Sequence, residues 1–200
     1  MRASVSVEGE IDRGDELSVS RYISGAYYSS ECTIAEQAGD VLEQDQLYLV
    51  PFPIWRTGNF DKIAVYQWGA TQATLNWRLC VFKDDRSISG DFTVALDAGT
   101  LSANTATGLR EITIAEEFSR GLYWIGVRPE DAAPAAAKLS RYALPYYYRR
   151  YLPVHGLNSD PTQFSTGFKM ASTGALATIT PTRAHFETQV DMPCVWLRRA

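Results

Sequence analysis

The chain has 200 residues, of which 46% are hydrophobic and 21% charged, and it carries a formal net charge of −4. This length fits one all-β domain with appendages, and the acidic balance disfavours nucleic-acid binding, because phosphate backbones repel an acidic surface. No run approaches the roughly 20 apolar residues that span a bilayer, and residues 1–8 lack the apolar stretch of a signal peptide, so we expect no membrane partner.

The N-terminal segment is polar, with five carboxylates in its first 20 residues: Glu8, Glu10, Asp12, Asp15 and Glu16. Alone, such a segment buries too little surface to offset the entropy of ordering it. Two interpretations stay open, that it packs on a neighbouring subunit or that it adds a strand to its own domain. We expect residues 1–45 to form an N-terminal arm or anchor, in which 22–30 is β-prone. The pattern of 33–44 is ambiguous: it allows a short amphipathic helix, and Gly39 disfavours one.

The rest of the chain is predicted to be β-structure. In the run 74–83, Leu75, Trp77, Leu79 and Val81 share one parity, as a strand with one buried face requires. Similar runs recur about every ten residues with turn-forming residues between them, a spacing typical of an antiparallel β-sandwich. Strands are predicted at 47–52, 60–68, 74–83, 94–101, 109–114, 122–127, 138–144 and 194–197.

Several details of this sandwich follow from local sequence. The runs 60–68 and 74–83 resemble a hairpin pair, and Asp97-Ala-Gly99 marks a bend or bulge. Residues 115–121 favour one helical turn ending at Gly121, and 122–127 is apolar enough for a central strand. Pro51 and Pro53 predict an edge or a strand end. The core is predicted to contain Trp77, Leu79, Val81, Ile112, Ile114, Trp124 and Val195.

The three cysteines, Cys32, Cys80 and Cys194, are far apart in sequence and do not form a disulfide framework. Two of them lie in apolar strands, where reduced cysteine behaves as a small hydrophobic residue. We therefore expect no disulfide and assembly in a reducing cytoplasm.

The order of five segments resembles the jelly-roll β-sandwich modules of tailed-bacteriophage virion proteins, found on tail fibres, receptor-binding proteins and spikes. The segments are 47–53, 60–65, Leu96-Asp-Ala-Gly-Thr-Leu101, Gly121-Leu-Tyr-Trp-Ile125 and Val195-Trp-Leu-Arg198. The resemblance covers residues 47–130 and the last strand, and it implies an outward-displayed, often trimeric virion component. It implies no catalytic residue.

Catalytic and cofactor sites are not evident. The two histidines, His155 and His185, lie apart with no nucleophile motif, and carboxylates such as Glu116 and Glu117 are adjacent residues of the kind usually solvated. The cysteines and histidines lack metal-ligand spacing. We expect no enzyme activity, no metal and no cofactor.

Aromatic residues are the one group that suggests a contact surface. The candidates are Trp55, Trp68, Tyr146, Tyr147, Tyr148 and Tyr151. Exposed rings stack on sugars or fill subunit pockets, whereas buried ones only complete the core, and all three interpretations stay open.

The sequence therefore predicts an all-β protein, an antiparallel jelly-roll β-sandwich over 46–200 preceded by an extended arm over 1–45. We expect a structural component of a phage or phage-like virion, homotrimeric, assembled in the host cytoplasm and joined to other virion proteins through residues 1–45. A host-surface glycan is a candidate partner. A carbohydrate-binding module is the alternative, and a glycan hydrolase is a minor one.

Overall fold

The computed structural model describes residues 23–29, 34–36, 42–84, 92–104, 107–143, 168–179, 181 and 192–200. The described residues form strands and one short 3-10 turn, with no α-helix among them. The strands are β1 (Tyr27–Tyr28), β2 (Ile34–Glu36), β3 (Gln46–Ile54), β4 (Gly58–Gly69), β5 (Asn76–Asp84), β6 (Phe92–Ser102), β7 (Gly108–Phe118), β8 (Gly121–Glu130), β9 (Ala137–Leu139), β10 (Arg141–Ala143), β11 (Phe168–Ala171), β12 (Met192–Pro193) and β13 (Val195–Arg199), and the turn is η2 (Leu176–Thr178).

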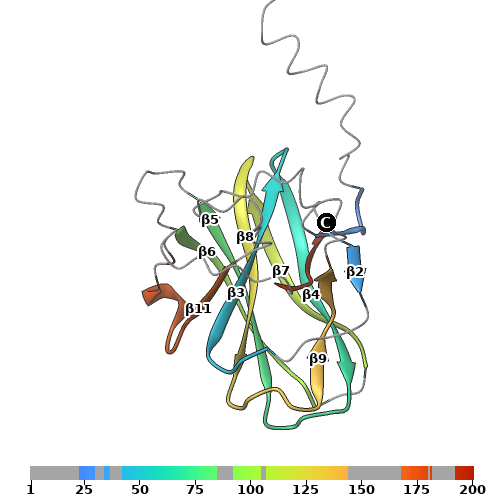
Figure 1. Cartoon of the computed structure of the whole chain (residues 1–200). Coiled ribbons are helices and arrows are strands. Elements are labelled where there is room, and N and C mark those ends of the chain that lie inside the picture. Colours follow the sequence, from blue (N-terminus) through green and yellow to red (C-terminus); the bar gives the residue numbers. More distant parts are fainter. Residues whose placement is uncertain are drawn as a thin grey trace, which may run out of the picture.

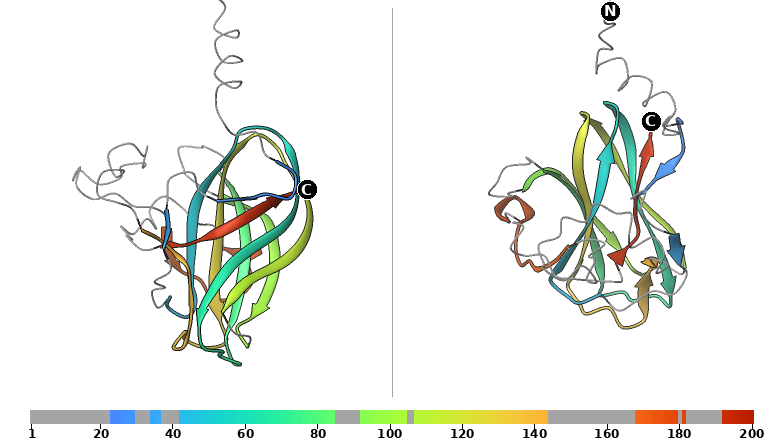
Figure 2. Two further views of the ribbon diagram at one scale, coloured as in Figure 1. Left: turned by 90° about the vertical axis from the view of Figure 1, so that its right-hand side faces the viewer. Right: turned by 45° about the horizontal axis from the view of Figure 1, so that its top comes forward.

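Two five-stranded antiparallel sheets pack face to face (Figures 1 and 2). Sheet A has the order β1-β13-β4-β7, with β9 also paired to β4, and sheet C has the order β11-β3-β8-β5-β6. A small sheet B, β12-β10-β2, completes the described strands. The predicted fold class, an all-β antiparallel sandwich, is confirmed.

The strands of the two large sheets pair as nested hairpins. Eight of them, taken in chain order, are β1, β3, β4, β5, β6, β7, β8 and β13. The first pairs with the last, the second with the seventh, the third with the sixth and the fourth with the fifth: β1 with β13, β3 with β8, β4 with β7, and β5 with β6. Each connection outside the central β5–β6 hairpin carries the chain from one sheet to the other, so the two sheets cannot fold independently.

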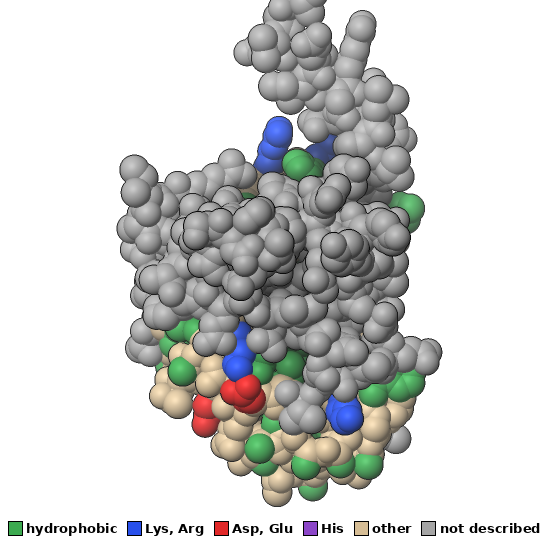
Figure 3. Space-filling model, in the orientation of Figure 1, with side chains coloured by type: hydrophobic (Ala, Val, Ile, Leu, Met, Phe, Trp, Pro, Cys, Tyr) green, Lys and Arg blue, Asp and Glu red, His purple; other side chains and the backbone are tan. Residues whose placement is uncertain are grey.

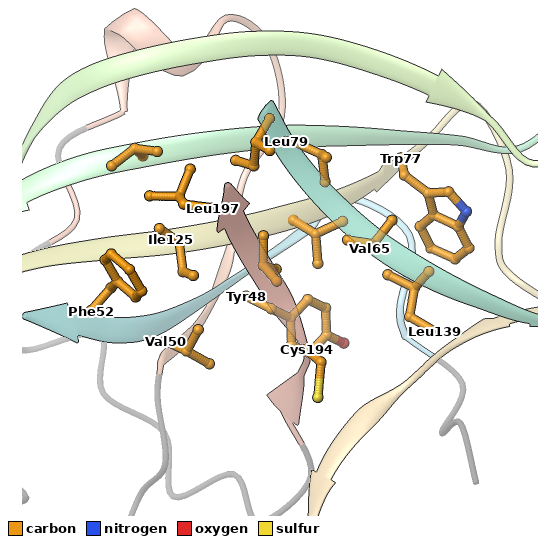
Figure 4. Close-up of a cluster of buried hydrophobic side chains, with 14 of the residues drawn as sticks. Tyr48, Val50, Phe52, Val65, Trp77, Leu79, Ile125, Leu139, Cys194 and Leu197 are labelled. Atoms are coloured by element: carbon orange, nitrogen blue, oxygen red, sulfur yellow. The ribbon is translucent and has the colours of Figure 1, made fainter. Parts of the chain in front are cut away.

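The main core lies between sheets A and C (Figure 4). Trp77, Leu79 and Val81 of β5 are completely buried in it, so they share one face as predicted. The expectation that only this face of the strand is buried is wrong, because Cys80 and Phe82, of the opposite parity, are also completely buried. Sheet A contributes Val65, Val195 and Leu197 from its own inner face. Ile114 is buried and Ile112 is partly buried against the same cluster, as predicted for 109–114.

A second hydrophobic cluster covers the opposite face of sheet C. It contains Leu47, Leu49, Cys80, Phe82, Phe92, Trp124 and Leu176. Trp124 is therefore buried as predicted, but it lies on the other side of the sheet from Trp77. Both faces of β8 are buried, because Trp124 points into one cluster and Ile125 into the other. The strand is flanked by β3 and β5, which confirms 122–127 as a central strand.

Gly126 permits the close approach of β3 and β8. A Cβ atom built there would lie 2.4 Å from Leu49 Cδ2 and 2.6 Å from the Tyr48 carbonyl oxygen. Any larger side chain would force the two strands apart, so the residue is determined by packing.

Two local predictions hold. The register of β5 against β6 shifts between Leu79 and Cys80, so Ala98 lies opposite no residue, and Gly99 has φ of 92°; this is the bulge predicted at Asp97–Gly99. Pro51 and Pro53 occupy the half of β3 that β11 does not cover, since β11 pairs only with residues 46–49. A proline there removes no ladder hydrogen bond to β11.

Two other predictions are wrong. The runs 60–68 and 74–83 are not a hairpin, because β4 pairs with β7, β9 and β13 in sheet A whereas β5 pairs with β6 and β8 in sheet C. Residues 115–118 continue strand β7 rather than forming a helical turn, since Glu116 and Glu117 are held in register with Phe60 and Asn59.

The described part of the expected arm is tied to the sandwich. β1 pairs with β13, β2 pairs with β10, and Leu42 is buried in the main core. Of the alternatives left open for 33–44, the helix is not formed at 34–36, which are strand β2. The described sandwich thus includes residues on both sides of the boundary expected at residue 46, while residues 1–22 lie outside the described part.

Candidate interaction surface

The outer face of sheet A carries a row of aromatic side chains. Val65 and Gln67 of β4 are completely buried, so the alternate residues Tyr66 and Trp68 leave the strand on its outer side, where both are half-buried. Trp196 of β13 lies opposite Ala64 of β4. Because Ala64 has the same parity as Tyr66, Trp196 also lies on the outer side of the sheet, where it is half-buried. Leu109 of β7, opposite Tyr66, is 43% exposed. We call Tyr66, Trp68, Leu109 and Trp196 the sheet-A face; Ala64, which has the same parity, has no exposed surface of its own.

The rings of this face are held in place. The Tyr66 and Trp68 ring centroids are 4.8 Å apart with a tilt of 42° between the ring planes. The Trp68 indole Nε1 donates to Ser140 Oγ at 2.5 Å, and the Ser140 amide donates to the Tyr66 carbonyl at 2.8 Å. A surface with pre-ordered aromatic rings loses little conformational entropy when a partner covers it.

Ion pairs border the sheet-A face. Lys62 Nζ lies 2.8 Å from Glu111 Oε2, and Arg198 donates from Nε and Nη2 to the two oxygens of Asp61 at 2.9 and 2.5 Å. The Arg198 guanidinium also lies 5.9 Å from the centre of the Tyr27 ring. Polar groups around an apolar centre are the usual composition of an interface that forms between soluble proteins.

The bidentate contact from Arg198 holds the pKa of the Asp61 carboxyl below its usual value. A carboxyl whose folded-state pKa is depressed contributes stability above its unfolded pKa and loses that contribution as the pH falls through the folded value. Both groups are accessible to solvent, so the contribution of this pair is small and decreases with salt.

The other predicted aromatic candidates lie elsewhere. Trp55 is 40% exposed in the β3–β4 connection, at the opposite end of β4 from Trp68, so the two tryptophans do not share a surface. Tyr146, Tyr147, Tyr148 and Tyr151 lie outside the described residues. Sequence reasoning missed Tyr66, Leu109 and Trp196, although the alternation of buried and polar positions in 60–68 and 109–114 was the signal that could have placed two of them outward.

A second polar site lies near the C-terminal end of the central strand β8, around Arg128. This arginine is 3% exposed, and its guanidinium donates to Glu130 Oε1, to Ser172 Oγ at 2.7 Å and to the Gly174 carbonyl at 2.8 Å. Arg78 joins the same carboxylate, with Nη1 3.5 Å from Glu130 Oε2, and holds Asp97 with two nitrogens. We call Arg128, Glu130, Ser172 and Gly174 the Arg128 clasp.

The clasp borders an open hollow of about 410 Å³, lined by Asp45, Arg78, Arg128, Glu130, Asp131, Gly174 and Ala175. Every nitrogen of the Arg128 guanidinium already donates to a protein acceptor. The cluster consequently has a structural explanation: it fastens residues 172–174 to the C-terminal end of strand β8. Among the described residues no group of three His, Cys, Asp or Glu side chains is placed to hold a metal ion.

Glu116, Glu117 and Asp84 do not form a hydrolytic pair. Glu116 and Glu117 are consecutive strand residues, so their side chains leave β7 on opposite faces. Asp84 is buried, and its Oδ2 accepts a hydrogen bond from Trp124 Nε1 at 3.3 Å. Glycoside hydrolysis requires two carboxyl groups facing one another across the substrate, and these three residues do not provide them.

Burial decides the chemistry of the described cysteines. Cys80 and Cys194 are free thiols with no exposed surface. Burial in the cluster on the outer face of sheet C raises the pKa of the Cys80 thiol far above its ordinary value. The thiolate is the reactive form, so this thiol is inert in the folded protein.

This predicts a two-phase thiol titration at pH 8. In a Cys32→Ser variant, dithiobis-nitrobenzoate should label less than about 5% of the thiols in the time that labels them all in urea, because reaction requires global opening of the core. Rapid labelling of one thiol in the native protein would contradict the burial of Cys80 or Cys194.

No described helix is long and apolar enough to cross a bilayer. Searches against protein-family models, curated proteins and solved structures found no match for this chain. The class that fold and surface define is an antiparallel β-sandwich with a pre-ordered aromatic face on one sheet.

Proposed function

We propose that the protein is a non-enzymatic structural component of a phage or phage-like particle, of the tail-fibre or spike type, displayed outward. The nested pairing of β1, β3–β8 and β13 supports this most directly, because it agrees with the strand order expected of a double-sheet jelly roll, an architecture that viral capsid proteins share with lectins and cupins. The segment order at 47–130 and 195–198 that resembles phage virion modules adds to it.

In this proposal the sheet-A face packs between subunits of a homotrimer. Tryptophan and tyrosine are enriched where subunits meet. Leu109 would bury the most apolar surface in such an interface, since it is among the most exposed large apolar residues described. The ion pairs Lys62–Glu111 and Arg198–Asp61 would form the polar rim. Nothing in this role requires a cofactor or a catalytic residue.

The test is the oligomeric state of the purified chain and its presence in particles. Sedimentation should give three times the 22.3 kDa chain mass, and Leu109→Asp should shift it to the monomer because a carboxylate would be buried in the interface. Ser102→Asp, at an exposed position of edge strand β6, is the matched control and should leave the trimer intact. Mass spectrometry of gradient-purified particles from the source should detect peptides of this chain.

A carbohydrate-binding module is the second candidate, favoured by the paired Tyr66 and Trp68 rings, because aromatic faces stack on sugars. A monomer that is missing from particles, and whose glycan-array signal disappears in Trp68→Ala, would replace the virion proposal with this one. A trimer found in particles would exclude it as the main role. A glycan hydrolase keeps the lowest rank, since Glu116 and Glu117 leave β7 on opposite faces and Asp84 is buried.

A further inference from the structure

The end of the sandwich opposite Trp68 carries exposed apolar and basic side chains side by side. We call Ile23, Trp55, Arg56, Arg120 and Arg199 the Trp55 end. Ile23 is 67% exposed and Trp55 40% exposed, two of the three large hydrophobic residues classed as exposed in the described part of the chain. Figure 3 shows basic side chains beside hydrophobic ones at this end, at the top of the view.

Hydrogen bonds bring these residues together from four separate segments. The Arg120 amide donates to Thr57 Oγ1 at 3.2 Å, which joins the β7–β8 turn to the β3–β4 connection. Arg199 Nη1 donates to the Asn59 carbonyl at 2.8 Å, and the Gly25 amide donates to the Arg199 carbonyl at 2.8 Å. The Trp55 end is therefore a fixed surface rather than a set of unrelated loops.

Its basic charge is largely uncompensated. Arg56 and Arg120 are exposed, and no hydrogen bond or ion pair engages either guanidinium within the part of the chain that the structure describes. Arg199 interacts with a carbonyl and, at 5.6 Å, with the Phe60 ring. The nearest acidic side chain in the register is Glu117, opposite Asn59. Tryptophan flanked by arginine is the composition found where binding energy concentrates.

The first 20 residues of the chain have the complementary composition. They hold five carboxylates and two arginines, a net charge of −3. Glu8, Glu10 and Asp12 share one parity, while Val5, Val7 and Ile11 share the other, so an extended conformation places carboxylates on one side and apolar groups on the other. Only two residues separate this segment from Ile23, which belongs to the Trp55 end.

We propose that the acidic segment of residues 1–20 docks on the Trp55 end of the sandwich, with its carboxylates at Arg56, Arg120 and Arg199 and its apolar side against Trp55 and Ile23. The 22 residues that precede Ile23 span up to about 70 Å when extended, enough to reach the same end of the chain's own sandwich or of a second copy. The docking does not depend on the virion role, so its failure would leave the proposed function intact.

The test uses the full-length chain with Arg56→Lys and Arg120→Lys, which keep the charge and supply amines. A carbodiimide should then cross-link Glu8 or Glu10 to residue 56 or 120, detected by peptide mass spectrometry. Mixing ¹⁵N-labelled and unlabelled chains tells whether the link forms within one chain or between two; either result supports the docking, and the second makes it an assembly contact.

Hydrogen exchange supplies the matched control. In the double variant Arg56→Glu with Arg120→Glu, the amides of residues 4–12 should exchange about tenfold faster than in the wild-type chain, because two ion pairs are replaced by repulsion. Lys138→Glu, a single charge reversal near the opposite end of β4, should leave them unchanged. No cross-link, or equal exchange rates in all three proteins, would overturn the proposal.

Discussion

Trp77→Ala is expected to lower the free energy of unfolding by about 3–5 kcal/mol. The indole is completely buried between the two sheets, so its removal leaves a cavity that the β-sandwich cannot close without moving β5. It also removes the donor that faces Gln67, since Trp77 Nε1 lies 3.4 Å from Gln67 Oε1 and the Gln67 side chain is itself fully buried. Urea denaturation monitored by far-UV circular dichroism measures the change.

Trp55→Ala is the matched control, because it deletes the same side chain at a position 40% exposed to solvent. It should cost less than about 1 kcal/mol, as surface substitutions usually do. If Trp77→Ala were no more costly than Trp55→Ala, the register of β5 would be wrong by one residue, since such a slip moves every side chain to the other face.

The second large effect is expected at the Arg128 clasp. Arg128→Met should destabilise the protein by about 3 kcal/mol, because removing one member of a buried ion pair leaves the other without its counter-charge. Here it also strips the Ser172 hydroxyl and the Gly174 carbonyl of their donor. The value belongs at the low end of the usual range, since Glu130 is 16% exposed and keeps Arg78 as a neighbour.

Lys62→Met tests whether this loss comes from burial rather than from charge alone. Lys62 pairs with Glu111 at 2.8 Å, as closely as many buried pairs, but the two side chains are 23% and 27% exposed. Its removal should cost less than about 1 kcal/mol. Equal losses at Arg128 and Lys62 in the same urea titration would show that the clasp contributes no more than a surface pair.

The sheet-A face could not be predicted from local sequence patterns. The aromatic residues chosen from the sequence were selected as local clusters or loop positions, and two of them, Trp55 and Trp68, lie at opposite ends of β4. The sheet-A face instead combines Tyr66 and Trp68 of β4 with single residues from β7 and β13, three strands whose contributions are more than 40 residues apart along the chain. Such a face exists only after the strands have paired, so no local window contains it.

The sequence by itself determined where most strands lie and which side chains of each strand share a face. Alternation over 74–83 was enough to bury Trp77, Leu79 and Val81, because side-chain direction within a strand depends only on local backbone geometry. The glycine in Asp97-Ala-Gly99 was likewise enough to place the bulge, since its φ of 92° is a conformation that other residues avoid.

Only the tertiary structure decided which strands pair and which sheet each one joins. β4 and β5 are neighbours in sequence with compatible patterns, yet they lie in different sheets because β13, β7 and β8 offer partners that close the nested pairing. Trp124 shows the same limit: its burial was predicted, but its face was not. Pairing is set by hydrogen bonds and packing between segments far apart in the chain. A pattern of period two indicates neither which strand is the partner nor what packs against each face of the sheet.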